Sequence, residues 1–263
     1  MQSGQCLKID STKSLVMKSH PSPSCAVILA AGKGSRMNHP KLPKPLVPFM
    51  GRPLLEWVIS GICKSGINRI IVVIGWRGEL IRSYLGSHYQ GTPLLYSTQH
   101  RLTGTADAIA SAMPLISNDE VVLLALGDVI VKPDWYSCLC NLWNKRPYLD
   151  ALLTLVASNP SLGSMVSFNS RLRATSILSR PVGVQDGWRD GGISLFNYDS
   201  LLALTSVDIY AYGEHRMTYG ISNQIRQGKT IGVEIYTGPW YDMMSQDAIK
   251  KAEGVEASKP IWI

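Results

Sequence analysis

The chain has 263 residues, of which 45% are hydrophobic and 17% are charged. This composition excludes a disordered tail, a collagen-like fibre and an acidic solvating protein, and the length allows a substantial core. No apolar run approaches the ~20 residues that cross a bilayer, and the first 24 residues lack the continuous apolar stretch of a secretory signal. We therefore expect a cytoplasmic protein without a membrane partner.

Lysine and arginine outnumber aspartate and glutamate by 26 to 19, which gives a formal net charge of +7. The cations are dispersed, without a basic run or interleaved aromatics, so we expect no nucleic-acid partner. We interpret the charge as suited to a small phosphorylated substrate. The 5 cysteines form no CxxC pair, which predicts buried, reduced thiols in place of a disulfide framework or a zinc site.

The chain order of apolar segments predicts an α/β domain over residues 25–263, preceded by an N-terminal extension over 1–24 that lacks periodicity and is expected to be flexible. Short β-branched runs alternate with helical patterns up to Asp128, which is typical of βαβ units and a mostly parallel sheet. Beyond Asp128 the pattern indicates mixed sheet. The predicted strands are 26–30, 69–74, 94–97, 121–126, 151–157, 164–169, 174–178, 193–196 and 230–236, and the predicted helices are 53–64, 78–85, 105–113, 133–144, 214–227 and 246–253.

A glycine-rich turn follows the first predicted strand. In Val27-Ile-Leu-Ala-Ala-Gly-Lys-Gly-Ser-Arg-Met37, two glycines and two cations come where backbone amides can turn toward an anion. A dinucleotide fingerprint would need a third glycine in place of Met37 and a helix directly after it, but the prolines of 38–45 cannot continue a helix. A Walker A loop is absent too, because no Gly-Lys-Ser/Thr closes the turn.

Three segments together carry a family resemblance. Leu29-Ala-Ala-Gly-Lys-Gly-Ser-Arg-Met37, Pro43-Lys-Pro-Leu46 and Gly51-Arg-Pro-Leu54 resemble, in order and spacing, the motifs of the sugar-phosphate nucleotidylyltransferases. The resemblance implies a single Rossmann-like α/β domain with a mixed, mostly parallel central sheet flanked by helices. It also implies an enzyme that joins a nucleoside triphosphate to a sugar 1-phosphate, releases pyrophosphate and uses Mg²⁺. No repeat or heptad indicates an oligomeric state.

Later segments continue this resemblance. Gln99 and the following Gly104-Thr105 are similar to the family's element that recognises the nucleobase, although a plain helix start capped by Thr105 stays open. Leu126-Gly-Asp128, at the end of a predicted strand, resembles the metal-binding Gly-Asp of the family, and ligands of open α/β sheets bind at that edge. Gly238-Pro-Trp-Tyr-Asp242 resembles the element that supplies a second carboxylate.

The resemblance assigns a role to each of these residues. Arg36 would hold the departing pyrophosphate through charge-assisted bonds, and Lys44 would lie at the α-phosphate and the incoming phosphate. Asp128 and Asp242 would bridge Mg²⁺, a hard ion that prefers oxygen ligands, to the phosphates. The catalytic residues are then Arg36, Lys44 and Asp128, the metal ligands are Asp128 and Asp242, and the triphosphate is bound at Ala30, Ala31, Gly32, Lys33 and Gly34.

The part of the sequence that would bind the acceptor departs from the family pattern. Ser179 stands in place of a carboxylate that binds sugar hydroxyls, while Arg180 could bind phosphate in place of a lysine. Asp190 replaces an asparagine that lines the sugar pocket, and Gly163 lies where a backbone amide would meet a sugar hydroxyl. Thr218 belongs to a segment that resembles a helix start facing the sugar, and a plain capping role stays open.

Two other functions therefore stay open. A CTP-dependent cytidylyltransferase acting on a polyol, inositol or choline phosphate would suit Ser179, and binding of CTP in preference to UTP would favour it. A non-catalytic module that binds nucleotide-sugars is the other alternative, although a sensor needs no clamp such as Arg36 on the leaving group. The Gly-Thr that follows Gln99 favours a pyrimidine triphosphate such as UTP or dTTP, and purines stay open.

Overall fold

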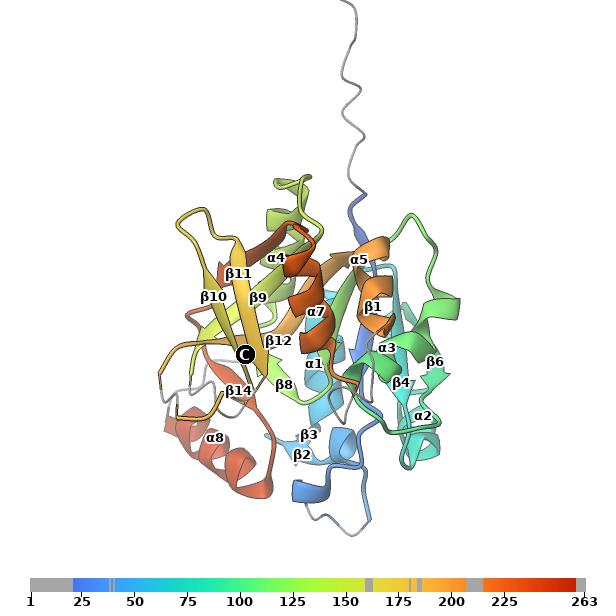
Figure 1. Ribbon diagram of the computed structural model, residues 1–263. Helices are drawn as coiled ribbons and strands as arrows, with labels where there is room; N and C mark the ends of the chain where they lie inside the picture. Colours follow the sequence, from blue (N-terminus) through green and yellow to red (C-terminus); the bar gives the residue numbers. More distant parts are fainter. Residues whose placement is uncertain are drawn as a thin grey trace, which may run out of the picture.

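The computed structural model describes residues 21–37, 39, 41–158, 163–179, 181–183, 186–206 and 215–258. In these residues a 10-stranded mixed sheet forms the centre of the fold (Figure 1). Along the sheet the strands are β11 (Ala174–Ser179), β10 (Ser164–Phe168), β12 (Trp188–Asn197), β7 (Val121–Leu126), β1 (Pro23–Leu29), β4 (Arg69–Ile74), β6 (Thr92–Thr98) and β5 (His88–Tyr89), while β9 (Ala151–Ala157) pairs with β12 and β13 (Ile231–Ile235) pairs with β9.

The centre of the sheet is parallel, as the sequence predicts. β1 pairs in parallel with β4 and β7, so that Val27 lies between Ile71 and Leu124, and β6 continues the parallel order beyond β4. β12 then runs antiparallel to β7 and makes the sheet mixed. Strands with helices on both faces bury all their side chains, which explains the continuous apolar runs of β1, β4 and β7. The carboxyl ends of β1 and β7 meet at one edge.

Helices cover both faces of the sheet. Ala26 and Ile28 of β1 pack with residues of α1 (Leu54–Cys63), α2 (Gly78–Leu85) and α4 (Asp134–Asn144). Cys25 and Val27 point to the opposite face and pack with residues of α3 (Thr105–Ala112), α5 (Tyr198–Ala203) and α7 (Met217–Arg226), because successive side chains of a strand alternate between faces. The result is a three-layer α/β/α domain (Figure 1), which confirms the predicted fold class.

A third apolar cluster supports the segment that follows β1. It joins Met37, Phe49 and Ile130 to Met243 and Ile249. These residues come from η1 (Ser35–Met37), the β2 (Pro48–Phe49) and β3 (Arg52–Pro53) hairpin, the pair formed by β8 (Val129–Val131) and β14 (Trp240–Asp242), and α8 (Gln246–Ser258). Met37 is only 1% exposed, so the glycine-rich turn is anchored at its end by burial of an apolar side chain.

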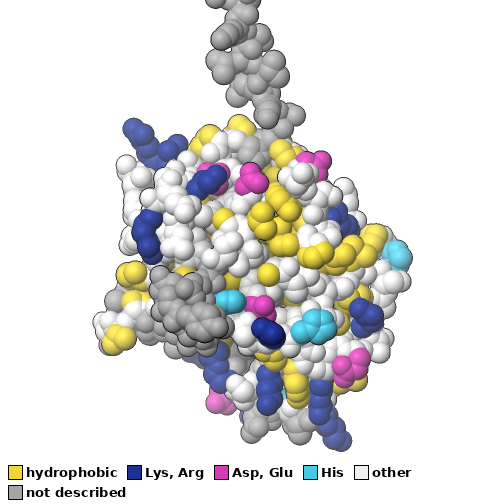
Figure 2. All heavy atoms as spheres, turned by 45° about the vertical axis from the view of Figure 1, so that its right-hand side comes forward, with side chains coloured by type: hydrophobic (Ala, Val, Ile, Leu, Met, Phe, Trp, Pro, Cys, Tyr) yellow, Lys and Arg dark blue, Asp and Glu magenta, His cyan; other side chains and the backbone are white. Residues whose placement is uncertain are grey.

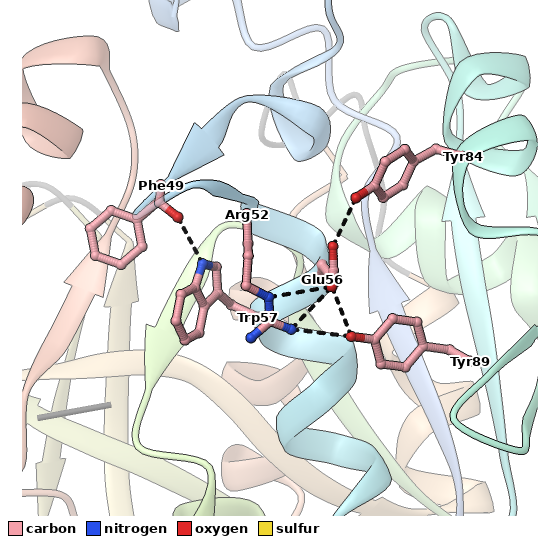
Figure 3. A network of polar contacts seen from close by, with 6 residues as sticks. All are labelled: Phe49, Arg52, Glu56, Trp57, Tyr84 and Tyr89. Carbon is pink, nitrogen blue, oxygen red and sulfur yellow. Dashed lines mark hydrogen bonds and ion pairs between the residues drawn. The ribbon is translucent and has the colours of Figure 1, made fainter. Parts of the chain in front are cut away.

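A network around Glu56 ties α1 to the neighbouring elements (Figure 3). Its carboxylate accepts hydrogen bonds from the hydroxyls of Tyr84 and Tyr89, each at 2.9 Å, and forms an ion pair with Arg52 at 3.2 Å. The Arg52 guanidinium also lies 4.5 Å from the ring centroid of Trp57. Burial alone would raise the pKa of Glu56, but these hydrogen bonds and the arginine lower it below its usual value. The network therefore favours the ionised carboxylate.

Several boundaries differ from the predictions. β12 begins at Trp188, before the predicted 193, because the strand continues through Gly191 and Gly192 with a register shift against β9, and glycines carry no strand signal. α8 extends beyond the predicted 253 to Ser258, and α7 begins at Met217. α5 and the strands β2, β3, β5, β8 and β14 were not predicted, since two- or three-residue strands show no periodicity. The predicted extension 1–24 is two residues too long, because β1 begins at Pro23. Residues 1–20 lie outside the described residues, so the rest of the extension stays a prediction.

The surface and the cysteines of the described residues can be compared with the sequence predictions. Every helix in the described part of the chain is too short or too polar to cross a membrane. Figure 2 shows lysine and arginine side chains spaced apart over the face that it presents. The four described cysteines are free; Cys25 and Cys140 are buried, but Cys63 is half-buried and Cys138 is exposed. The prediction of buried thiols is therefore wrong for Cys138, which points away from the buried face of α4.

Candidate functional site

A cavity of about 490 Å³ opens at the carboxyl edge of β1 and β7, whose last residues Leu29 and Leu126 line it. This is the edge at which open α/β sheets bind ligands. Most predicted site residues line the cavity: Ala30, Ala31, Gly32, Gly34, Arg36, Lys44, Gln99, Gly104, Thr105, Asp128, Gly163, Asp190 and Asp242. Lys33 is exposed and lies outside this lining, and Arg180 lies outside the described residues.

The glycine-rich turn forms one wall of the cavity. The amide of Ala30 donates to the carbonyl of Val73 at 2.9 Å, and the amide of Met37 donates to the carbonyl of Gly34 at 2.8 Å. Gly34 has φ +63°, in the left-handed region, and a Cβ there would lie 2.7 Å from Cβ of Lys44. Only glycine lets the turn approach Lys44 this closely, so the loop and the lysine form one unit.

Two cations of this wall face sulfur and carboxylate partners. Nη1 of Arg36 lies 3.3 Å from Sδ of Met244, a weak acceptor, and the residue is exposed at the mouth of the cavity. Lys44, at the start of η2 (Lys44–Leu46), forms an ion pair with Asp128, and its side chain is 13% exposed. Both cations line the same cavity as the glycine-rich turn.

Two carboxylates meet at the floor of the cavity because two short strands pair. Asp128 follows β7, and Asp242 ends β14, which pairs antiparallel with β8 so that Val129 lies opposite Asp242. The amide of Met243 donates to the carbonyl of Asp128 at 3.0 Å. Burial and then the charge of Asp128 raise the pKa of Asp242, while Arg189 and Lys44 oppose this shift. The sequence predicted both carboxylates, and the structure brings them together.

This pair of carboxylates fits a magnesium ion. Mg²⁺ is usually held by one or two carboxylates and takes its remaining ligands from substrate phosphates and water. Among the described residues no group of three or more His, Cys, Asp or Glu side chains could hold a metal by itself. Two neighbouring carboxylates beside the glycine-rich turn therefore match a cation whose other ligands come from outside the chain.

The opposite end of the cavity holds Gln99, which is 6% exposed. Its side-chain nitrogen Nε2 donates to the carbonyl of Gly104 at 3.0 Å and to Oδ2 of Asp107 at 2.8 Å. A backbone carbonyl and a carboxylate can accept hydrogen bonds but cannot donate them, so these two partners fix the orientation of the Gln99 amide and occupy its two N–H groups. The side-chain oxygen of Gln99 is left as the hydrogen-bonding group for a ligand.

The Gly104-Thr105 turn is clamped to the segment that precedes α7. Gly104 has φ +136°, and a Cβ there would collide with the carbonyl oxygen of His215, which accepts a 2.8 Å hydrogen bond from the amide of Ala106. The Thr105 hydroxyl accepts from the amide of Met217 at 2.9 Å. Thr105 therefore does not cap α3, which it begins; it satisfies the first amide of α7.

Between the two carboxylates and α7 the cavity is lined by polar side chains. The hydroxyls of Ser164 and Thr218 lie 2.9 Å apart, and Nη1 of Arg216 donates to Oγ of Ser179 at 3.0 Å. Burial raises the pKa of Asp190, whose Oδ1 accepts from the amide of Gly192 at 3.1 Å. Hydroxyls, a carboxylate and a guanidinium at this end form a surface suited to the hydroxyl groups of a small polar ligand.

Sequence reasoning missed Arg189, which lines the cavity beside Asp242. Arg189 forms an ion pair with Asp242, and the absent Cβ of Gly163 leaves the space that its Nε occupies. Arg216, Ser164 and Met244 line the cavity and were missed too. The sequence offers for Arg189 only a cation next to Asp190, outside every predicted strand, and this does not distinguish a buried residue from an exposed one.

Comparison with known proteins gives one family match. The model of the MobA-like NTP transferase domain matches residues 26–175. Over 162 residues the chain is 40% identical to the bifunctional protein GlmU of Blochmanniella pennsylvanica, which covers 61% of this chain and 34% of that protein. Over 111 residues it is 32% identical to the D-glycero-alpha-D-manno-heptose 1-phosphate guanylyltransferase of Aneurinibacillus thermoaerophilus, covering 41% of this chain and 48% of that enzyme.

Among solved structures, UDP-glucose pyrophosphorylase in complex with UDP-glucose is similar in fold. It has a TM-score of 0.80 at 17% identity, and the match covers 90% of this chain and 99% of that one. A Bacillus anthracis protein assigned as a glucose-1-phosphate thymidylyltransferase matches with a TM-score of 0.77 at 21% identity. The match covers 88% of this chain and 95% of that one. The aligned part is less than half the length of the two curated relatives named above.

Proposed function

The chain belongs to the family of MobA-like NTP transferase domains, and on that premise we propose that it transfers a nucleotidyl group from a nucleoside triphosphate to a sugar 1-phosphate, forming a nucleotide-sugar and pyrophosphate. One observation carries the proposal: Lys44, Asp128 and Asp242 converge beside the glycine-rich loop in a single cavity. The names of its relatives agree with it, since one is a heptose 1-phosphate guanylyltransferase.

The proposed reaction brings two anions together, and the site is built to offset their repulsion. An oxygen of the phosphate monoester attacks the α-phosphorus, a P–O bond forms, and the bond to the β-phosphate breaks to release pyrophosphate. Amides of the turn at Gly32 and Gly34 bind the triphosphate, Arg36 holds the pyrophosphate, and Lys44 stabilises charge at the α-phosphate. The attacking phosphate is already ionised at neutral pH, so no general base is required.

We propose that Asp128 and Asp242 hold Mg²⁺. When bound, the ion would supply positive charge to the phosphate oxygens. The chain's own part is to keep the two carboxylates side by side through the β8–β14 pairing and to keep Lys44 at Asp128. Lys44 and Arg189 already pair with these carboxylates, so the support for Mg²⁺ comes from two neighbouring carboxylates beside the glycine-rich turn, the kind of oxygen ligands that this ion prefers.

The orientation of Gln99 supports a choice of nucleobase. Its free side-chain oxygen accepts hydrogen bonds, so it suits a base that presents a ring N–H, as uracil, thymine and guanine do. The ring N3 of cytosine carries no hydrogen, so cytosine could donate to this oxygen only through its exocyclic amino group. This geometry favours a UTP-, dTTP- or GTP-dependent enzyme over the CTP-dependent alternative acting on a polyol, inositol or choline phosphate.

The non-catalytic alternative receives less support from the site. A module that only binds a nucleotide-sugar needs no second carboxylate beside a lysine, whereas Asp242 lies buried next to Asp128 and Lys44. We also propose that the protein works in the cytoplasm; the four free cysteines support this, because oxidising compartments favour disulfides.

Pyrophosphate release tests the proposal directly. The protein would be assayed with Mg²⁺ and each of the four ribonucleoside triphosphates and dTTP, against a panel of sugar 1-phosphates with polyol and choline phosphates. We expect release with a sugar 1-phosphate and a base that carries a ring N–H, and loss of release in Asp128→Asn. Release with CTP and choline or polyol phosphate would favour the alternative enzyme, and nucleotide binding without release for any pair would favour the non-catalytic module.

A further inference from the structure

Arg189 is buried in the cavity with hydrogen-bonding capacity left over. The residue is only 7% exposed, and it lies on β12, where its backbone is held between Met165 of β10 and Val156 of β9. Five N–H groups of a guanidinium need acceptors when the group is removed from water. Among the described residues, Asp242 is the only one that accepts a hydrogen bond from this guanidinium, through Nη2.

The buried Nε of Arg189 has no hydrogen-bond partner in the described part of the chain. The side chain is held firmly all the same. Its Cζ lies 4.9 Å from the ring centroid of Trp240, whose indole N–H donates to the carbonyl of Gly191 at 3.0 Å, and a Cβ at Gly163 would overlap Nε. With Nη2 on a carboxylate and Nε covered by the backbone at Gly163, the group that Arg189 has left for a ligand in the cavity is Nη1.

The position of Arg189 identifies the chemistry of that ligand. The guanidinium pairs with Asp242, which lies beside the ion pair of Lys44 with Asp128. Arg189 therefore lies at the end of the cavity opposite to Gln99. The triphosphate is expected along the loop of Gly32 and Gly34, so Arg189 faces the other reactant. The two N–H donors of Nη1 carry the charge of the guanidinium, and such donors match the oxygens of a phosphate group better than they match a sugar hydroxyl.

We propose that Arg189 binds the phosphate of the acceptor, an inference that rests on the proposed function and names the residue that holds its second substrate. Its ion pair with Asp242 then has a second consequence: the guanidinium neutralises that carboxylate and competes with a divalent cation for it. Removing Arg189 therefore weakens phosphate binding and strengthens metal binding, whereas a residue with a purely structural role would weaken both.

Binding measurements test this without turnover. Isothermal titration would measure the Kd of inorganic phosphate for protein saturated with an α,β-methylene nucleoside triphosphate, so that the triphosphate loop is occupied. We expect Arg189→Gln to raise this Kd by about 10- to 100-fold, the range for a hydrogen bond to a charged group, and Arg189→Lys to give an intermediate value. Arg171→Gln is the matched control, because Arg171 is exposed and lies outside the cavity lining; its Kd should not change.

Two further measurements keep the test decisive. Gly163→Ala retains every charge but displaces the guanidinium, so it should also weaken phosphate binding, and it replaces Arg189→Gln if that variant does not fold. Mn²⁺ titrated into the nucleotide-free protein and followed by electron paramagnetic resonance should bind several-fold more tightly to Arg189→Gln.

Three outcomes would overturn the proposal. They are failure of the wild-type protein to bind phosphate, an Arg189→Gln Kd for phosphate within twofold of wild type, and parallel loss of phosphate and Mn²⁺ binding. If phosphate and Mn²⁺ bind as expected here but no pair of substrates releases pyrophosphate, the proposed function is refuted and the role of Arg189 is not.

Discussion

The close approach of the glycine-rich turn to Lys44 gives the sharpest test of the site. In Gly34→Ala the new Cβ meets Cβ of Lys44 at 2.7 Å, at a residue whose φ is +63°. The left-handed conformation costs an alanine about 1–2 kcal/mol. The contact involves the base of the lysine side chain, which cannot rotate away, so either the turn or η2 must move.

The expected loss of activity follows from that movement. Relieving the overlap displaces Lys44 or the loop amides by roughly 0.5–1 Å, and misplacement of about 1 Å can cost ~100-fold in rate. A 100-fold loss corresponds to about 2.7 kcal/mol of transition-state stabilisation. We therefore expect kcat/KM for pyrophosphate release to fall by about two orders of magnitude, with the protein still folded.

Gly66→Ala separates this effect from backbone strain. Gly66 has φ +83° and no atom within 4 Å of an added Cβ, and it lies in the turn between α1 and β4. Both variants should lower Tm by about 2–8 °C, at 2–4 °C per kcal/mol for a domain of this size. Only Gly34→Ala should lose turnover. Equal pyrophosphate release by the two variants would refute the reasoning that the turn positions Lys44.

Three more predictions follow from the same contacts. Asp128→Asn removes the partner of Lys44 and one charge of the proposed metal site. Steady-state assays should show a lower kcat that corresponds to a loss of about 3–4 kcal/mol of transition-state stabilisation, with an unchanged circular dichroism spectrum. Near-normal turnover would contradict the assignment. Asp107→Asn lets the Gln99 amide reverse, so the ratio of kcat/KM for UTP to that for CTP should fall by about tenfold, and a constant ratio would refute the orientation argument. Glu56→Gln should lower the free energy of urea unfolding by about 1–2 kcal/mol at pH 7. Because the folded pKa of Glu56 is lowered, its contribution is present above the unfolded value of about 4.3 and is lost as the pH falls through the folded value, so the difference should vanish near pH 3; a difference independent of pH would contradict the network.

The order of elements and the glycine-rich turn could be predicted from the sequence because both are local. Buried parallel strands produce the continuous apolar runs of β1, β4 and β7, and the glycines after β1 are close in sequence to the cations that follow. The short strands were missed for the same reason: two or three residues of β8 or β14 contain no periodic signal.

The α/β class and the glycine-rich turn could be read from the sequence alone, and the family resemblance singled out Lys44, Asp128 and Asp242 as candidates. What surrounds these residues followed only from the folded structure. The pair of Arg189 with Asp242 joins residues 53 positions apart, and that of Lys44 with Asp128 spans 84 positions. Such contacts arise when segments distant in the chain, here η2, β12 and β14, come together at one edge of the central sheet, and no local pattern of residue types encodes which side chains will then face one another.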